Sequence, residues 1–191
     1  IVLRNKNLTW QEVPPPGGYG SETYKALVPG GSLPALQHDG HLLSDSEAIA
    51  EYLNELKPDP DMLPGGPLER ARIRERSRFH DTRLEPALRA LFPMIGHQPD
   101  AEEVSGKWSV LRERLAQMET LLPETSPCLT LADCGLPVTC LWIAELATHF
   151  RIDSIVSRRM LAHLEELNAH RAVADELSQY APRLRTWVAS R

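Results

Sequence analysis

The chain has 191 residues and a formal net charge of −5, which is enough length for one or two domains with a real core. No basic block accompanies this charge, so we expect no nucleic-acid partner. No apolar run reaches the ~18 residues that span a bilayer and no secretion signal is visible, so we expect no membrane partner and a cytoplasmic location. Three cysteines, an odd number, fit free thiols in a reducing compartment.

The first part of the chain alternates short elements with turns. Residues 1–8 look like the last turns of a helix, and residues 9–13 alternate as in a strand. The proline- and glycine-rich residues 14–20 predict a loop. Ser21 then caps a short helix over residues 22–27, which ends before Pro29 because a residue preceding proline is driven out of the helical region.

A hairpin and a helix follow. Residues 32–36 predict a short strand with Pro34 at its centre. A proline there means that the strand lies at a sheet edge or leaves that position unpaired. The turn at residues 38–40 leads to a partner strand over residues 41–43. Residues 44–46 open a helix that runs to Leu56, with its apolar side chains on one face.

Residues 57–67 contain four prolines and two glycines and predict a linker between domains of residues 1–56 and 68–191. Everything after this linker follows a helical pattern, and Pro86 should bend or split its first helix. Further helices are expected over residues 101–122, from residue 130 onward with a kink at Pro137, over 158–168, and around 181–188.

Thr130 and Asp133 have the spacing of a capping box, in which each side chain accepts a hydrogen bond from the other residue's backbone amide. We therefore interpret both as residues that stabilise the fold and not as catalytic groups. The cysteines and histidines show no metal-ligand spacing, so no metal site is expected.

Three motifs in order resemble the cytosolic glutathione S-transferases, with the class undetermined: L-P-A-L at residues 33–36, D-S-E-A-I at 45–49 and T-L-A-D at 130–133. The resemblance implies an α/β thioredoxin-like N-terminal domain followed by an all-helical C-terminal domain. It also implies that the first strand and part of the first helix of the thioredoxin-like domain precede Ile1, because the chain starts inside a helix.

The same resemblance assigns a glutathione site to Leu33, Pro34, Asp45 and Ser46. In the family the proline is cis and the backbone of the residue before it pairs with the cysteinyl part of glutathione, while the acidic-Ser pair holds the γ-glutamyl end. A helix N-terminus suits the ligand's carboxylate and an adjacent acid suits its ammonium group. The alternative interpretation is that residues 44–46 only cap the helix.

The resemblance implies a transferase that conjugates the glutathione thiolate to a small hydrophobic electrophile, as in detoxification, and that forms a homodimer. Glutathione would be its co-substrate, activated by lowering the thiol pKa. The catalytic Tyr, Ser or Cys would lie upstream of Ile1, and Phe79 and Arg83 are candidates for the electrophile site. A glutathione-dependent isomerase, dehalogenase or thiol reductase on the same fold stays open, and so does a non-catalytic binding module.

Overall fold

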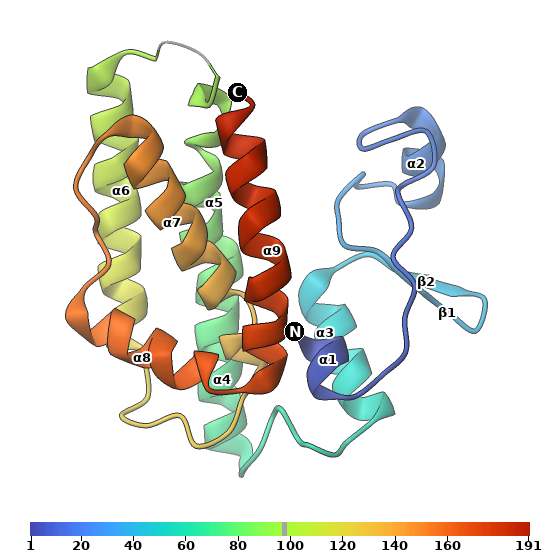
Figure 1. Ribbon diagram of the computed structural model, residues 1–191. Helices are drawn as coiled ribbons and strands as arrows, with labels where there is room; N and C mark the ends of the chain where they lie inside the picture. Colours follow the sequence, from blue (N-terminus) through green and yellow to red (C-terminus); the bar gives the residue numbers. More distant parts are fainter. Residues whose placement is uncertain (97–98) are drawn as a thin grey trace. The chain divides into compact units, whose positions relative to one another are not determined.

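A computed structural model describes residues 1–96 and 99–191 of the chain (Figure 1). Its internal contacts divide the chain into two compact units. We call Val2–Asp61 the N-terminal unit, and Met62–Arg191 together with Ile1 the helical unit. The division falls inside the proline-rich segment over residues 57–67, and each unit is described by itself.

The N-terminal unit contains three helices and one hairpin: α1 (Val2–Asn5), α2 (Glu22–Leu27), β1 (Leu36–His38), β2 (His41–Leu43) and α3 (Ser46–Leu56). The bounds of α2 and α3 confirm the predicted helices, and the Ser21 hydroxyl caps α2 by accepting from the Tyr24 amide. The strand predicted over residues 9–13 is wrong, because this segment has no regular structure. It has no partner strand in the described unit, and Trp10 and Val13 are exposed.

The hairpin forms a two-stranded antiparallel sheet in which Leu36 pairs with Leu43 and His38 with His41. Its turn consists of Asp39 and Gly40, both with positive φ, as tight hairpins with right-handed twist require. The strand predicted over residues 32–36 is wrong in its bounds, since β1 begins only at Leu36. Pro34 has no amide hydrogen for a ladder, which explains why pairing starts beyond it.

A buried lysine joins distant parts of the N-terminal unit. Lys6 has no exposed surface, and its Nζ donates to Asn54 Oδ1 at 2.6 Å and to the carbonyl of Pro60. Burial lowers the pKa of Lys6, because removal from water disfavours the ammonium form. This contact connects the end of α1 to α3 and to the segment that follows it.

The helical unit begins with a helix that changes pitch. It consists of α4 (Pro67–Phe79), the π-helical turn η1 (His80–Leu84), α5 (Glu85–Arg89) and the 3₁₀ turn η2 (Phe92–Met94). The predicted break at Pro86 is confirmed, because the π-helical turn ends at Leu84 and Pro86 lies in the first turn of α5. Pro86 has no amide hydrogen with which to continue the preceding helical hydrogen bonds.

The remaining elements are α6 (Ala101–Thr120), the 3₁₀ turn η3 (Leu131–Asp133), α7 (Leu136–Phe150), α8 (Arg158–Asn168) and α9 (Arg171–Ala189). The kink predicted at Pro137 is wrong. Pro137 stands in the first turn of α7, where its missing amide hydrogen has no helical partner to lose. The Thr130–Asp133 box accordingly closes the η3 turn, and α7 starts three residues later.

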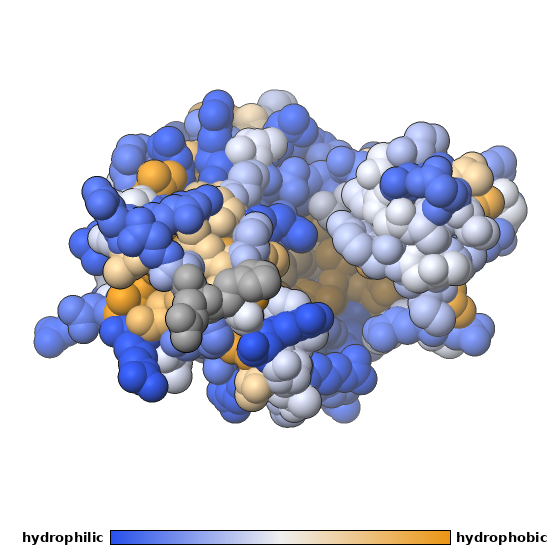
Figure 2. Space-filling view, turned by 90° about the horizontal axis from the view of Figure 1, so that it is seen from above, coloured by the Kyte–Doolittle hydropathy of each residue, from blue (hydrophilic) through white to orange (hydrophobic). Residues whose placement is uncertain are grey.

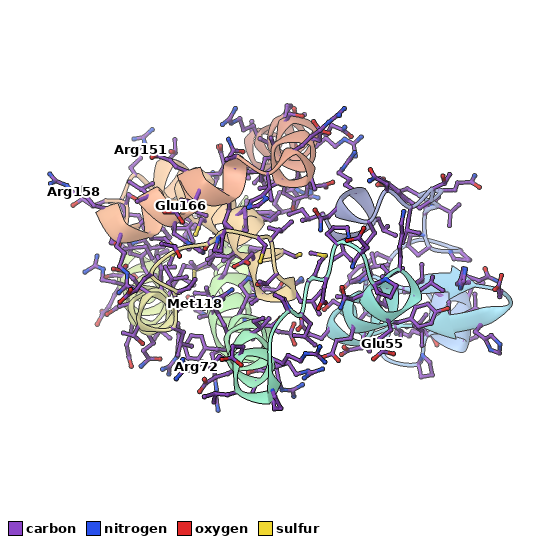
Figure 3. The ribbon with its side chains drawn as sticks, turned by 90° about the horizontal axis from the view of Figure 1, so that it is seen from below. Glu55, Arg72, Met118, Arg151, Arg158 and Glu166 are labelled. Atoms are coloured by element: carbon purple, nitrogen blue, oxygen red, sulfur yellow. The ribbon has the colours of Figure 1, made fainter. Side chains whose placement is uncertain are left out.

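The core of the helical unit surrounds α7, which packs against α5 and α9. Leu136, Ile143 and Leu146 on this helix have no exposed surface, and Met118 of α6 points into the same interior while Arg151 and Arg158 project outward (Figure 3). The face seen in Figure 2 is mostly hydrophilic with small apolar patches. Apolar side chains are thus largely withdrawn from this face, as expected for a water-exposed surface.

In the described part of the chain, one helical segment, Leu131–Phe150, is long and apolar enough to cross a membrane by length and composition. More than half of its apolar window, 56%, is buried inside the protein. The burial matches the behaviour of a central core helix, whose apolar residues face neighbouring helices on several sides.

Candidate functional site

The hairpin brings the two predicted glutathione-binding segments together. The ladder from Leu36 to Leu43 returns the chain alongside itself, and the Ser32 hydroxyl donates to the carbonyl of Ser44 at 3.4 Å. Leu33 and Pro34 therefore lie next to the start of α3, which carries the other two predicted residues. The expected cis bond between Leu33 and Pro34 is present.

The start of α3 has an acidic cap and a free hydroxyl. Asp45 is the N-cap residue, and its Oδ1 accepts from the Ala48 amide at 2.9 Å. Ser46 is the first helical residue, is exposed, and its hydroxyl makes no hydrogen bond within the described residues. The capping role thus belongs to Asp45 alone. Both residues are exposed, and within the described residues neither the second Asp45 oxygen nor the Ser46 hydroxyl makes a hydrogen bond, so a ligand can reach these groups.

Leu33 offers backbone groups beside this helix start. The residue is 49% exposed, and in residues 1–96 and 99–191 no hydrogen bond to its amide or carbonyl is formed. The neighbouring Ser32 carbonyl is held by the Tyr24 hydroxyl at 2.8 Å, and Tyr24 is itself buried. Sequence reasoning did not identify Tyr24 as a residue that positions this segment. Its place on the apolar side of a short helix was the signal that could have indicated this role.

These groups have the chemistry that a zwitterionic peptide requires. The Leu33 amide and carbonyl have no hydrogen-bond partner among the described residues, so they can pair with a ligand backbone as an added strand would. The first amides of α3 and the Ser46 hydroxyl suit a carboxylate, because the amides of a first helical turn lack helical partners and carry partial positive charge. The Asp45 carboxylate suits an ammonium group.

The two candidates for the electrophile site, Phe79 and Arg83, lie in the helical unit and differ in exposure. Phe79 ends α4 and packs half-buried against the core, whereas Arg83 is exposed within η1. Between them, His80 lies against Thr139, with 2.8 Å from its Nε2 to the Thr139 hydroxyl. Burial lowers the pKa of His80, which favours the neutral ring.

The Thr130–Asp133 capping box is confirmed, and it is part of a larger buried network. Asp133 Oδ2 accepts from the Thr130 amide at 2.8 Å and from its hydroxyl at 2.5 Å. Arg76 of α4 donates from Nη2 to Asp133 Oδ1 at 2.8 Å and to the Thr130 hydroxyl at 3.0 Å. Sequence reasoning missed Arg76, because a run of arginines and glutamates on one helix looks like a solvated face.

Neither a metal centre nor a disulfide arises from the described residues. Among them, no cluster of three or more His, Cys, Asp or Glu side chains has the geometry to hold a metal ion. Cys128, Cys134 and Cys140 form no disulfide with one another, and they are exposed, half-buried and buried in that order. Burial raises the pKa of Cys140 to about 12, so this thiol is an unreactive core residue.

Comparison with known proteins places this geometry in a family. Residues 1–61 match the model for the N-terminal domain of glutathione S-transferases. The chain is 36% identical over 141 residues to a maleylacetoacetate isomerase from Pseudomonas aeruginosa, over 67% of this chain and 65% of the relative. This chain belongs to the cytosolic glutathione S-transferase family.

Other proteins resemble this chain over a shorter stretch of sequence or only in their fold. A probable maleylacetoacetate isomerase from Drosophila melanogaster is 46% identical over 55 residues, which are 29% of this chain and 22% of the relative. A glutathione transferase structure from Bombyx mori has a TM-score of 0.78 at 20% identity, covering 99% of this chain and 88% of that one. The chain spans less than two thirds of the length of the first curated relatives it matches.

The solved structures also include a maleyl pyruvate isomerase described as a bacterial zeta-class glutathione S-transferase. It has a TM-score of 0.70 at 22% identity and covers 91% of this chain and 87% of that one. Identities at this level support the fold alone. The predicted fold class, a thioredoxin-like N-terminal domain followed by a helical domain, is confirmed by these structural neighbours.

Proposed function

We propose that this chain is part of a glutathione-dependent isomerase that acts on a maleyl-type acid. The observation that carries the proposal is the shared name of several curated relatives, maleylacetoacetate isomerase, in Pseudomonas aeruginosa, Dictyostelium discoideum and Rattus norvegicus. The motif resemblance by itself favoured conjugation to a hydrophobic electrophile, and these relatives support the isomerase alternative better.

In the proposal, Leu33 and Pro34 align the tripeptide through the Leu33 backbone, and Asp45 and Ser46 hold its γ-glutamyl end. When bound, the thiol supplies reversible addition to a carbon–carbon double bond next to a carbonyl, which permits rotation about that bond. The exposed guanidinium of Arg83 suits a carboxylate of the acid substrate, and Phe79 suits its apolar part.

Counting thiols separates isomerisation from conjugation. An isomerase returns glutathione unchanged, so the maleyl acid should be converted to its trans isomer with no loss of titratable thiol. A conjugating transferase consumes one thiol for each product. Turnover that depends on glutathione but consumes it in equal amount would contradict the isomerase proposal, and binding without turnover of either kind would favour a non-catalytic module.

Paired variants at the start of α3 test the glutathione site. We expect Ser46→Ala to weaken glutathione binding by roughly tenfold or more, because it removes a charge-assisted hydrogen bond of ~1.5–3 kcal/mol. The free energy of unfolding should barely change, since the Ser46 hydroxyl makes no hydrogen bond within the described chain.

Asp45→Ala should weaken glutathione binding similarly, by leaving the ligand's ammonium group without a partner. It should also lower the free energy of unfolding by about 1 kcal/mol, through loss of the cap on the Ala48 amide. Titration calorimetry and urea unfolding on both variants give the two readouts. Unchanged affinity in both variants would mean that this helix start has only a structural role.

The proposal extends to assembly and location. We expect a homodimer, because family members pair across a two-fold axis. We expect a cytoplasmic location, because three cysteines without a disulfide fit a reducing compartment. Light scattering at micromolar concentration should return about twice the 21.4 kDa mass of the chain. A monomer would contradict the proposed homodimer but would not bear on the proposed glutathione site.

A further inference from the structure

A serine, a histidine and an aspartate from three different elements lie next to one another in the helical unit. Ser126 stands on the segment that joins α6 to η3, and its hydroxyl lies 3.3 Å from Nδ1 of His163 in α8. On the other side of the same ring, Nε2 lies 3.8 Å from Oδ1 of Asp133 in η3. Enzymes that transfer acyl groups use these three side chains in this order.

The surroundings of His163 decide which ring nitrogen carries the proton. The Asp133 carboxylate attracts the N–H of the neutral ring, so the proton lies on Nε2 and Nδ1 accepts from the Ser126 hydroxyl. Burial lowers the pKa of His163, so the ring is neutral at pH 7 and able to take up a proton. Ser126 and His163 therefore have the arrangement of a nucleophile and its general base.

Asp133 is placed to stabilise the charge that forms on His163 during such a reaction. Within the described residues, the buried Nε2 of His163 has no hydrogen-bond partner. An imidazolium ring would gain the Asp133 carboxylate as its counter-ion, and the neutral ring gains less, so the attraction favours the transition state over the resting enzyme. Arg76 also donates to Asp133 at 2.8 Å, which shares the negative charge but holds the carboxylate in place.

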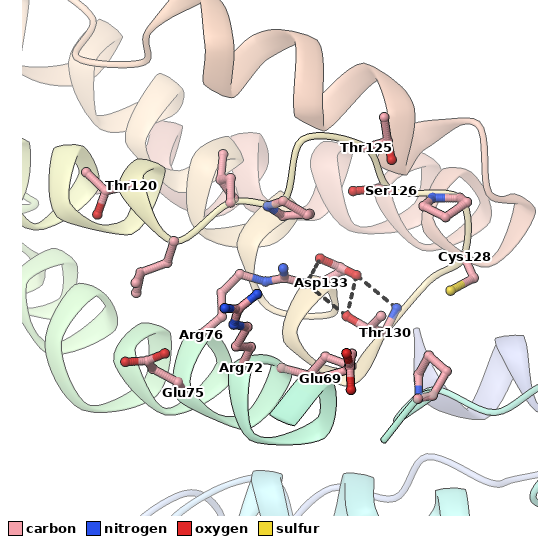
Figure 4. A pocket seen from close by; sticks show the side chains of 17 residues that line it. Glu69, Arg72, Glu75, Arg76, Thr120, Thr125, Ser126, Cys128, Thr130 and Asp133 are labelled. Atoms are coloured by element: carbon pink, nitrogen blue, oxygen red, sulfur yellow. Dashed lines mark hydrogen bonds and ion pairs between the residues drawn. The ribbon is translucent and has the colours of Figure 1, made fainter. Parts of the chain in front are cut away.

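Ser126 borders a cavity that is large enough for a small substrate. The cavity has a volume of about 610 Å³, within the ~300–1,000 Å³ of small-molecule sites, and the half-buried Ser126 is one of its lining residues. Figure 4 shows Ser126 on the segment across the cavity from α4, which carries Arg72 and Arg76. Leu122 and Pro123 add an apolar wall, against which a short acyl chain can pack.

A donor for developing negative charge lines the same cavity. Arg76 is buried, with a side chain that is 8% exposed, and its Nε has no hydrogen-bond partner in residues 1–96 and 99–191. Buried guanidinium N–H groups are normally satisfied, so an acceptor at this atom is favoured. The oxygen of a tetrahedral intermediate is such an acceptor, and it carries a full negative charge that an ester carbonyl lacks.

We propose that Ser126 and His163 catalyse the hydrolysis of a carboxylic ester with a short apolar acyl group, without glutathione. Ser126 Oγ attacks the carbonyl carbon and gives its proton to His163 Nδ1, and this proton passes to the leaving alkoxide as the ester C–O bond breaks. Water then attacks the acyl-serine, and its proton returns through His163 to Ser126 Oγ as the acid leaves. Asp133 positions the His163 ring. This activity does not depend on the proposed isomerase reaction.

Hydrolysis of p-nitrophenyl butyrate in the absence of glutathione tests this activity. The exposed thiol of Cys128 lines the same cavity and also attacks activated esters, so every protein compared carries Cys128→Ala. We expect Ser126→Ala to lower the rate of p-nitrophenolate release at least about hundredfold, since a positioned general base alone contributes roughly 10²–10⁴-fold. Equal rates with and without Ser126→Ala would overturn the proposal.

Thr125→Ala is the matched control for Ser126→Ala. Both residues carry a hydroxyl on the same segment, but the Thr125 hydroxyl makes no hydrogen bond with any described residue, whereas Ser126 lies against His163. Thr125→Ala should leave the rate of ester hydrolysis unchanged. An equal loss in the two variants would mean that a disturbed segment, and not a missing nucleophile, lowers the rate, which contradicts the proposal.

Covalent labelling identifies the nucleophile in the unaltered chain. An alkyl fluorophosphonate forms a phosphonate ester with a serine that a histidine activates, and fluoride leaves. Peptide mass spectrometry should find this adduct on Ser126, and His163→Gln should slow its formation at least about tenfold. No adduct on Ser126, or labelling of other serines to the same extent, would overturn the proposal.

Discussion

The two units of this chain are stabilised in different ways. The helical unit has a continuous apolar core, with side chains such as Leu111, Leu136 and Ile143 fully buried. In the N-terminal unit, buried hydrophobic side chains are confined to a short set, namely Tyr24, Val28, Ile49 and Leu53. A unit of this size buries a small fraction of its surface, so individual polar contacts carry a larger share of its stability.

Those polar contacts connect elements that are distant along the chain. Lys6 reaches Asn54, and His38 Nδ1 lies 2.7 Å from the Tyr52 hydroxyl, which joins the hairpin to α3. Among the described residues of the helical unit, Arg76 and Asp133 form a comparable buried network. A buried cation therefore stabilises both units, Lys6 in a unit with few buried apolar side chains and Arg76 in a unit with a large apolar core.

The largest expected effect is at the network of the helical unit. Asp133→Ala leaves Arg76 buried without its carboxylate, and breaking a buried ion pair in this way costs about 3–5 kcal/mol. Urea unfolding should report this loss, and Asp153→Ala, at an exposed acid, should change the free energy of unfolding by less than about 0.5 kcal/mol. Equal stability of the two variants would mean that Arg76 regains water on losing its partner.

Cavity-creating variants compare the two cores directly. Leu146→Ala removes a side chain with no exposed surface and should cost about 2–5 kcal/mol. Leu53→Ala in α3 should fall at the lower end of that range, because its surroundings in the smaller unit can collapse more easily. Hydrogen exchange resolved by peptide assigns each loss to its unit. A larger loss for Leu53→Ala would reverse the comparison.

The buried lysine tests the claim that polar contacts stabilise the smaller unit. Lys6→Met keeps a side chain of similar length but removes the ammonium group that donates to Asn54 Oδ1 and to the Pro60 carbonyl. This loss should lower the free energy of unfolding by about 1–3 kcal/mol. Lys25→Met removes an exposed pair with Glu22 and should cost well under 1 kcal/mol. A stabilising Lys6→Met would show that desolvation of the ammonium group outweighs its hydrogen bonds.

The smallest expected effect of a single variant is a change in the pH dependence that two histidines give the helical unit. Burial lowers the pKa of both His80 and His163 below the ordinary 6.5. The unfolded chain then binds more protons than the folded one, so stability is full above pH 6.5 and falls as the pH drops below it. Each histidine contributes at most about 1.4 kcal/mol per pH unit.

Thermal unfolding between pH 7.5 and 5.0 measures this dependence. His80→Gln and His163→Gln should each reduce the fall in melting temperature relative to the wild-type chain, since glutamine does not titrate. If the slope in both variants equals that of the wild type, other groups dominate the acid response and the two histidines have no part in it.

The amino-acid sequence alone determined most of the helical unit. The spacing of apolar residues predicted α6 and α8, the proline at residue 86 predicted the break before α5, and Thr130 with Asp133 predicted their capping box. The same local signals predicted Ser21 as the cap of α2 and the hairpin turn at residues 39 and 40. These features succeed because they depend on neighbours three or four residues away, which a sequence displays directly.

Only the tertiary structure decided which residues make long-range polar contacts and whether residues 9–13 and 32–36 form strands. Residues 9–13 alternate like a strand but pair with nothing in the described unit, since a strand needs a partner that its own pattern does not specify. Arg76 and Lys6 look like surface residues in sequence, and their partners lie 57 and 48 residues away. Burial of a charge depends on what the fold packs around it, and that information is distributed over the whole unit.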